Sequence, residues 1–561
     1  MTTDKLSIQA LVQICYKQGI RRVVFSPGSR NAPLVIAFSE HKGFETIVIP
    51  DERVAAFHAL GQGIATGKPS VICCTSGTAA LNYGPAIAEA YYQQVPLLVL
   101  TADRPVEWID MGIGQSMRQE AIFANYVKGS YQFTQEASHP DDLWYNERLA
   151  NKAITETTSG APGPVHINLP FRESLYTQAE QQPLRHPTLK VSRNDYVLSE
   201  EDITELKSVW SHTTKRLIII GQRQLDLEEN TVLNSLIKKG GVVVMTETTS
   251  NVRADKLIDC IDRVLPLVGE DDKYYPDLVI SFGGAIVSKR IKTFLKKAKP
   301  TYHIELGLGS AKDTYQRLSH HYKIQPLPVL EELLKFETMN TNYAQNWHQV
   351  NAKARALHNT FLAESSYCDL KVFEVLLKEI PESAILHFAS STPIRYSQLF
   401  SEYQANRLVQ CNRGVSGIDG STSTALGYAG CSDHLNILIT GDISFFYDSN
   451  AFWLRQRPSN LKVILINNGG GNIFKYIPGP ETTAQLSVFE ADHQLSARPV
   501  AQLYGLSYSR VSTLEDLEAA MPRFYSKELD KISILEINTK SCSNAETLRN
   551  YFDYLASNSS V

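Results

Sequence analysis

The 561-residue sequence has few of the features that mark several large classes of protein. Its eight cysteines are scattered, and no two of them form a CxxC pair, which argues against a zinc site and against a disulfide framework. No apolar run approaches the roughly 18 residues that a membrane-spanning helix needs. The formal net charge is -4, so there is no basic excess to attract nucleic acid or an anionic membrane surface. We therefore expect neither a nucleic-acid partner nor a membrane span.

The first residues also lack a basic region followed by a long apolar run. We expect them to form an amphipathic helix that stops at Gly19, not a signal peptide. With 43% apolar and 20% charged residues, the composition is that of an ordinary globular protein. A cytoplasmic location is therefore the expectation.

Short apolar runs rich in β-branched residues alternate with longer helical patterns along the whole chain. This alternation is typical of parallel α/β sheets. The chain is also longer than one hydrophobic core supports, and polar connecting segments lie near 181–195 and 340–368. The predicted fold class is α/β, with three domains that each contain a mostly parallel sheet flanked by helices. The predicted domains are 1–182, 196–340 and 365–561.

Polar motifs follow the predicted strands of the first and last thirds. Ligands of doubly wound sheets bind at the carboxyl ends of the strands, so these motifs are the candidates for function. In the first third they are SPGSRN (26–31), DERVAAFHALG (51–61), TSGTAALN (75–82) and TADRP (101–105). In the last third they are SSTPIR (390–395), NRGVSGIDG (412–420), GDISFFYD (441–448) and NNGGGNIF (467–474).

Two of these motifs suggest a metal and a diphosphate. Asp442 and Asn468 each follow an apolar strand, and Asn468 leads into a run of three glycines. A carboxylate, an amide oxygen and a backbone carbonyl suit Mg²⁺, which completes its shell with phosphate oxygens and water. Taken alone, Asn-Asn-Gly is as typical of a simple turn. Its combination with Gly-Asp favours a diphosphate-metal site.

The Gly-Asp and Asn-Asn pair at this spacing resembles the cofactor motif of the thiamin diphosphate enzyme superfamily. Those enzymes contain a pyrimidine-binding domain, a central domain and a diphosphate-binding domain, all α/β and in that order. The resemblance implies that Asp442, Asn468 and the carbonyl of Gly470 hold Mg²⁺, with Mn²⁺ as an alternative, and that thiamin diphosphate is the cofactor.

The same resemblance implies further cofactor contacts. Glu52 falls where the family's glutamate binds the aminopyrimidine ring and exchanges a proton with it; in isolation, Glu52 is better explained as an acid at a helix start. Ile418 matches the bulky residue that bends the cofactor, and Ser416 and Ile473 are implied as neighbours. Because that glutamate and the metal site come from different subunits in the family, a homodimer or homotetramer is implied.

Arginines follow several of the predicted strands: Arg30, Arg104, Arg395 and Arg413. Any one of them is better explained as a structural or solvated charge. Together they suggest a pocket for polyanionic small molecules, because the guanidinium group binds carboxylates with two parallel hydrogen bonds.

The strand-end motifs together resemble the 2-succinyl-5-enolpyruvyl-6-hydroxy-3-cyclohexene-1-carboxylate synthase family of menaquinone biosynthesis. The resemblance implies a transferase that decarboxylates 2-oxoglutarate and adds the succinyl carbanion equivalent to isochorismate. The implied catalytic residues are Glu52, Ser391, Arg395 and Arg413. The implied substrate contacts are Ser29, Arg30, Arg104, Gln115, Lys289, Arg290, Ser391, Arg395, Ile473 and Phe474.

One departure and two alternatives remain at this stage. The family often carries Asn where this chain has Gly114, next to Gln115, and His58 is expected to be a packing residue. The first alternative is another thiamin diphosphate-dependent 2-keto acid decarboxylase or carboligase, of the acetolactate synthase type. The second is a catalytically inactive nucleotide-binding protein on the same fold, since fold does not fix function; the intact Glu52, Asp442 and Asn468 argue against it.

Overall fold

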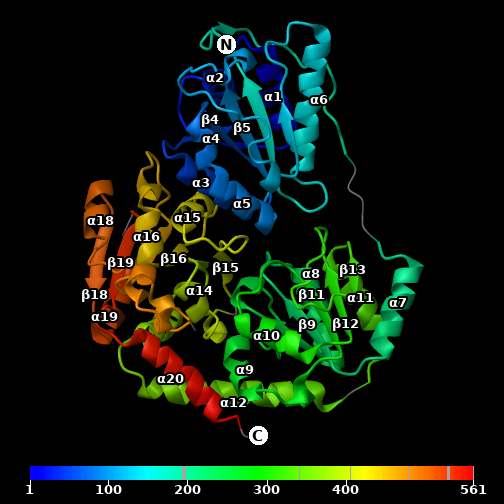
Figure 1. Ribbon diagram of the computed structural model, residues 1–561, viewed down its shortest axis with the longest axis vertical. Coiled ribbons are helices and arrows are strands. Elements are labelled where there is room, and N and C mark those ends of the chain that lie inside the picture. Colours follow the sequence, from blue (N-terminus) through cyan, green and yellow to red (C-terminus); the bar gives the residue numbers. More distant parts are fainter. Residues whose placement is uncertain (192–196, 340, 405, 478, 527–530, 560–561) are drawn as a thin grey trace. The chain divides into compact units, whose positions relative to one another are not determined.

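Three mostly parallel sheets, each flanked by helices, organise the chain (Figure 1). The structure is a computed structural model that describes residues 1–191, 197–339, 341–404, 406–477, 479–526 and 531–559. The predicted α/β class is confirmed. The predicted domain limits stay predictions, and those at 196, 340 and 561 lie outside the described residues. Contacts divide the chain into two compact units, 1–193 with 414–434 and 444–461, and 194–413 with 435–443 and 462–561.

The first unit contains a six-stranded sheet, three of whose central strands are buried along their whole length. Burial on both faces explains why these strands lack apolar-polar alternation in the sequence. In spatial order the strands are β3 (Glu45–Val48), β2 (Arg22–Phe25), β4 (Ser70–Cys74), β5 (Leu97–Asp103), β7 (Pro164–Pro170) and β6 (Ser130–Gln132). A short antiparallel pair, β1 (Thr2–Thr3) with β8 (Gln178–Ala179), ties the N-terminus to the end of this segment.

Six helices of the first unit lie within its first segment, 1–193. The helix expected to stop at Gly19 is α1, which ends at Lys17. Asp51 caps α3 by accepting a hydrogen bond from the Val54 amide, and the left-handed Gly67 ends that helix. The helices are α1 (Leu6–Lys17), α2 (Ala32–Glu40), α3 (Glu52–Thr66), α4 (Thr78–Asn82), α5 (Gly84–Gln93) and α6 (Pro140–Glu156).

A seventh helix of this unit, α15 (Ser421–Ala429), packs on α3 at backbone distance. A Cβ atom at Gly61 would lie 2.0 Å from the carbonyl oxygen of Thr424, and one at Gly427 would lie 1.9 Å from that of His58. Only glycine at these two positions allows the helices to approach so closely. The segment that carries Glu52 is thereby packed directly against a segment from the last third of the chain.

The second unit contains the other two sheets. The five-stranded sheet has the order β10 (Val242–Thr246), β9 (Arg216–Ile220), β11 (Leu278–Phe282), β12 (Tyr302–Leu306) and β13 (His320–Tyr322). The six-stranded sheet has the order β15 (Leu408–Cys411), β14 (Ile385–Phe388), β16 (Asn436–Gly441), β17 (Leu461–Asn467), β19 (Ser533–Asn538) and β18 (Ser507–Val511). One continuous cluster of buried apolar side chains includes residues of both sheets, so they share a core.

Helices cover both of these sheets. Around the five-stranded sheet lie α7 (Glu200–Ser211), α8 (Leu227–Lys239), α9 (Ile261–Val268), α10 (Lys289–Ala298) and α11 (Pro326–Lys335), followed by α12 (Asn342–Glu364). With the six-stranded sheet come α13 (Asp369–Glu379), α14 (Thr392–Ser397), α16 (Asp442–Tyr447), α17 (Leu486–Glu490), α18 (Arg498–Tyr504), α19 (Leu514–Phe524) and α20 (Asn544–Ser557). Within the residues described, none of the helices is both long and apolar enough to cross a membrane.

Candidate active site

The structure brings Asp442, Asn468 and Gly470 together at the ends of two neighbouring strands. Asp442 begins α16 directly after β16, and Asn468 with the glycine run directly follows β17. The Asp442 carboxylate accepts hydrogen bonds from the amides of Gly469 at 2.8 Å and Gly470 at 3.0 Å. Gly470 has φ 146° and a Cβ there would lie 2.8 Å from the carbonyl oxygen of Glu490, so this position requires glycine.

Asn468 is oriented by a residue that no sequence motif indicated. Its side-chain amide donates a 2.8 Å hydrogen bond to Asp369, which leaves the Asn468 amide oxygen as an acceptor. Asp369 is buried and also accepts a 2.6 Å bond from the Thr539 hydroxyl. Burial raises the pKa of Asp369 to about 6, although both hydrogen bonds act in the opposite direction. Asp369 lies far from the motif in sequence, which is why the motif did not reveal it.

These donors fit a hard divalent cation. The Asp442 carboxylate is buried, and burial raises its pKa, while His493 and the surrounding amides lower it. In the part of the chain that the structure describes, no group of three or more His, Cys, Asp or Glu side chains could hold a metal ion. A metal here would rely on one carboxylate, neutral oxygens and the ligand's phosphates, which is how Mg²⁺ is bound at such sites.

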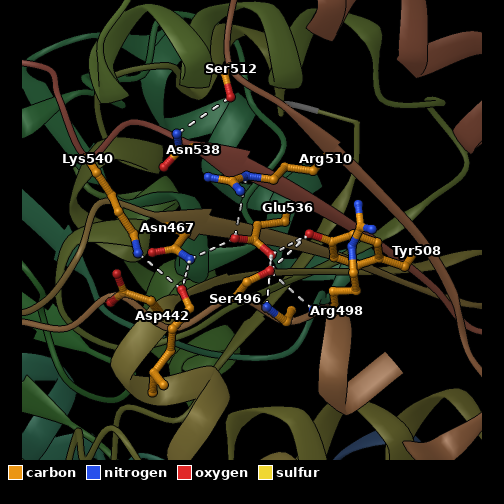
Figure 2. A network of polar contacts seen from close by, with 12 residues as sticks. Asp442, Asn467, Ser496, Arg498, Tyr508, Arg510, Ser512, Glu536, Asn538 and Lys540 are labelled. Atoms are coloured by element: carbon orange, nitrogen blue, oxygen red, sulfur yellow. Dashed lines mark hydrogen bonds and ion pairs between the residues drawn. The ribbon is translucent and has the colours of Figure 1, made fainter. Parts of the chain in front are cut away.

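A buried network centred on Glu536 supports the end of β17. Figure 2 shows the Glu536 carboxylate beside Asn467, whose amide donates to it at 2.8 Å. The Asn467 amide also donates to the carbonyl of Leu495 at 3.0 Å. Glu536 receives three more hydrogen bonds of 2.8–2.9 Å, from the Ser496 hydroxyl, the Ala497 amide and the Tyr508 hydroxyl. The network therefore fixes both the strand end that precedes Asn468 and the loop that follows α17.

The second unit also gathers four of the predicted cations. Lys289 and Arg290 open α10, Arg395 lies on α14, and Arg413 follows β15. The charges of Arg290 and Arg395 lower the pKa of both Asp262 and Tyr476. The charge of Arg413 lowers the pKa of Glu247. Lys289, Arg395 and Arg413 all lower the pKa of one further cation, Lys292. We call the five cations Lys289, Arg290, Lys292, Arg395 and Arg413 the cationic cluster.

The first unit brings together the other predicted substrate contacts. Arg30 is buried, donates to the carbonyl of Phe171 at 3.0 Å and forms an ion pair with Glu173 at 3.1 Å. Burial lowers the pKa of Arg30, and nearby Arg104 lowers it further. Arg104 donates a 2.9 Å hydrogen bond to the carbonyl of Gly114. This contact uses only the backbone of Gly114, so the departure from the family's Asn leaves it intact.

Three predicted site residues adopt backbone conformations that ordinary side chains rarely take. Gln115 has φ 54°, Ser391 has φ 77° and Ser416 has φ 72°. Such conformations cost free energy and persist where the surroundings enforce them, often at functional sites. Ser29, next to Arg30, is exposed and lies in the loop between β2 and α2.

Glu52 is the first residue of α3 and is partly buried. Burial raises the pKa of Glu52, with a smaller contribution in the same direction from Asp51. The Glu52 carboxylate also raises the pKa of two buried side chains, Cys74 and Tyr83. His58 is buried in the same helix, and burial lowers its pKa to about 4, as expected for a neutral packing residue.

The loop before Ile418 is held by Glu89, a buried acid on α5. Its carboxylate accepts hydrogen bonds from the amides of Gly414 at 2.6 Å and Val415 at 2.7 Å. Farther along, the Ser444 hydroxyl donates to the carbonyl of Ile418 at 2.5 Å, while the Ile418 side chain stays 37% exposed. A single acid within the apolar stretch AIAEA was the signal that could have identified Glu89 from sequence.

Ile473 and Phe474 lie in a short 3₁₀ helix, Asn472–Lys475, directly after the glycine run. Both are partly buried, and the Phe474 ring lies 5.9 Å from that of Phe489. Tyr476, two residues farther on, is the residue on which Arg290 and Arg395 act. The segment after the metal motif thus approaches the cationic cluster, although the role of Ile473 and Phe474 stays a prediction.

Two thiamine pyrophosphate enzyme families match long parts of the chain. The family described as "Thiamine pyrophosphate enzyme, N-terminal TPP binding domain" matches residues 7–125. The family described as "Middle domain of thiamine pyrophosphate" matches residues 185–388. These matches establish thiamine pyrophosphate enzyme domains in this protein.

Curated relatives match nearly the whole chain. A protein of Porphyromonas gingivalis is 39% identical over 99% of this chain and 98% of its own length. One of Flavobacterium johnsoniae is 40% identical over 98% of both chains, and one of Bacteroides thetaiotaomicron is 37% identical over 99% of this chain and all of its own. All three carry the same name. The chain therefore belongs to the 2-succinyl-5-enolpyruvyl-6-hydroxy-3-cyclohexene-1-carboxylate synthase family of thiamine pyrophosphate enzymes.

Proposed function

We propose that the protein decarboxylates 2-oxoglutarate and adds the succinyl group to isochorismate by 1,4-addition. The products are 2-succinyl-5-enolpyruvyl-6-hydroxy-3-cyclohexene-1-carboxylate and CO₂, in menaquinone biosynthesis. The observation that carries the proposal is the cationic cluster, because it lies in the unit that holds the metal motif and suits substrates with two carboxylates each. The acetolactate synthase-type alternative, with small acceptors of lower charge, does not account for so many cations.

Thiamin diphosphate supplies, when bound, the electron sink that decarboxylation of a 2-keto acid needs. Asp442, Asn468 and the carbonyl of Gly470 would hold Mg²⁺, or Mn²⁺ in its place, against the diphosphate. Glu52 would hold a proton at the pyrimidine ring, a role that its raised pKa favours. Ile418, Ser416 and Ile473 would complete the cofactor contacts.

The family resemblance assigns the substrate contacts to two sets of residues. In the first unit these are Ser29, Arg30, Arg104 and Gln115. In the second unit they are Ser391, Arg395, Arg413, Lys289 and Arg290, with Ile473 and Phe474 as an apolar wall. By the family resemblance, Glu52, Ser391, Arg395 and Arg413 would be the catalytic residues. We also propose that the protein forms a homodimer or homotetramer, because the family resemblance places Glu52 and the metal motif on different subunits. The location that we propose is the cytoplasm, as expected from the sequence.

The test is the product mass after incubation with thiamin diphosphate, Mg²⁺, 2-oxoglutarate and isochorismate. We expect the adduct and one CO₂ per turnover, and no product from pyruvate and a second keto acid. The opposite pattern would support the acetolactate synthase-type alternative. The variant Glu52→Gln tests the role of Glu52. It should still bind the cofactor and the metal but lose turnover by about 10²- to 10⁴-fold, the usual size of an acid–base contribution.

A further inference from the structure

The start of α10 is held by two carboxylates that belong to no sequence motif. Glu247, directly after β10, is buried and accepts hydrogen bonds from the amides of Val287 at 2.6 Å and Ser288 at 2.7 Å. Asp262, on α9, accepts a hydrogen bond from the Ser288 hydroxyl. The same hydroxyl caps the helix by accepting from the amide of Ile291 at 3.2 Å. The direction in which α10 presents its side chains is therefore fixed at its first turn.

Lys292 lies on the same face of α10 as Lys289, because residues three apart are neighbours on a helix. It is partly buried, and its ammonium group interacts electrostatically with Glu247, Arg413, Arg395 and Lys289. Burial lowers the pKa of Lys292 and the three cations lower it further, whereas Glu247 raises it. With the described residues, Lys292 forms neither a hydrogen bond nor an ion pair of 4.0 Å or less.

A half-buried ammonium group surrounded by other cations is unfavourable unless an anion joins them. The cationic cluster contains five positive charges, and among the described residues the carboxylates of Glu247 and Asp262 interact with it. Both carboxylates already accept hydrogen bonds from the segment before α10. Two negative charges against five positive ones leave an excess that a small dicarboxylate would neutralise in large part.

We propose that Lys292 is a further anion-binding residue of the substrate site, where it contacts a carboxylate of a dicarboxylate substrate. Glu247 is the positioning residue that holds α10 so that Lys292 reaches this carboxylate. The inference rests on the proposed function and adds to it a residue that the family resemblance did not supply. Lys292 also differs from its exposed neighbour Lys296, which acts on none of these groups and lies toward the end of the same helix.

The experiment compares Lys292→Met with Lys296→Met in the full-length enzyme loaded with thiamin diphosphate and Mg²⁺. Methionine keeps most of the length of the unbranched side chain and removes the ammonium group. For Lys292→Met we expect the KM for one dicarboxylate to rise about 10- to 100-fold, the size of a lost charge-assisted hydrogen bond, while kcat changes far less. Lys292→Arg should restore most of the affinity, and Lys296→Met should match the wild type.

Separate KM values for 2-oxoglutarate and isochorismate show which substrate Lys292 contacts. Glutarate, used as an unreactive inhibitor, gives a second readout: if 2-oxoglutarate is the ligand, the inhibition constant of glutarate should rise by a similar factor. Unchanged KM values for both substrates in Lys292→Met would overturn the role of Lys292 and leave the proposed function standing. If the wild-type enzyme formed no adduct from the two substrates, the proposed function itself would fail.

Glu247→Gln tests the positioning role through pH. Lys292 must be protonated to bind a carboxylate, so KM should rise as pH increases through its pKa. Because Glu247 raises that pKa, whereas Arg413, Arg395 and Lys289 lower it, Glu247→Gln should move the rise in KM to lower pH. A purely structural role would lower the thermal midpoint and leave the pH profile of KM in place, which would overturn this part of the inference.

Discussion

A single residue outside the metal motif, Asp369, orients one of the side chains within it. Asn468 has an amide that can face either way, and the hydrogen bond to Asp369 selects the orientation that frees its oxygen. The sequence revealed Asp442, Asn468 and Gly470 through their family spacing. It did not reveal Asp369, because a buried acid at the start of a helix has no pattern of its own until the fold brings it to its partner.

Replacing Asp369 with Asn should weaken metal binding. The substitution keeps the shape of the side chain but removes the charge that orients the Asn468 amide, and partners of metal ligands typically contribute 10- to 100-fold in affinity. We therefore expect the Mg²⁺ concentration needed for thiamin diphosphate binding to rise by about tenfold or more. The change can be measured from tryptophan fluorescence on titration with Mg²⁺ at fixed cofactor concentration. Asp553→Asn, at an exposed position on α20, is the control. An unchanged Mg²⁺ requirement in Asp369→Asn would remove this role.

At the scale of helices and strands, the sequence predicted buried elements better than exposed ones. Among the short apolar runs that predict strands, PVHINLP (164–170) coincides with β7, and the polar segment near 340–368 contains α12. Three strands that coincide with no such apolar run, β6, β13 and β18, lie at sheet edges. β18 reads SYSRV and only its last residue is buried, so the strand carries little of the apolar signal that identifies a central strand.

The close packing of α3 on α15 was not visible in the sequence either, and it makes a sharp prediction. Gly427→Ala places a methyl group against the His58 carbonyl, which belongs to the backbone and cannot rotate away. The helices must separate, so we expect a loss of about 1 to 3 kcal/mol in the free energy of unfolding and a lower thermal midpoint. The nearest atom to a Cβ at Gly430, at the end of the same helix, is 3.6 Å away. Gly430→Ala should therefore leave the midpoint unchanged, and equal effects of the two variants would contradict the packing argument.

At the scale of the whole molecule, buried histidines dominate the pH dependence of stability near neutrality. Burial lowers the pKa of five histidines to about 3 or 4: His58, His166, His303, His358 and His387. A histidine whose folded pKa is depressed contributes stability above its unfolded pKa, and this stability is lost as pH falls below about 6.5. Each should cost about 1 kcal/mol between pH 7 and 5.5.

Three buried acids act in the opposite direction. Burial raises the pKa of Asp369 and Asp448 to about 6 and that of Glu247 to about 7. Because their folded pKa values are raised, these groups stabilise the folded state more as pH falls. Each adds roughly 1 kcal/mol to the free energy of unfolding over the same interval. The five histidines outweigh the three acids, so we expect the thermal midpoint to fall from pH 7 to pH 5.5.

Differential scanning calorimetry across this interval measures the effect. His166→Asn should reduce the fall, whatever it does to the midpoint at pH 7, because one proton-binding group is lost from the unfolded chain. Ser211→Ala, at an exposed position and without loss of a proton-binding group, should not change the slope. A midpoint that rises toward pH 5.5 would show that the acids dominate.

The discontinuous first unit has a consequence for the synthesis of the protein. Its sheet is complete in the first 193 residues, but α15 and the loop that Glu89 holds belong to segments after residue 413. At translation rates of about 5 to 20 residues per second, the ribosome needs roughly 10 to 45 s to make the residues in between. During that time α3 has emerged but its glycine-lined contact surface for α15 has no partner. The nascent chain therefore carries an open helix-binding face throughout much of its synthesis, when chaperones and neighbouring chains can reach it.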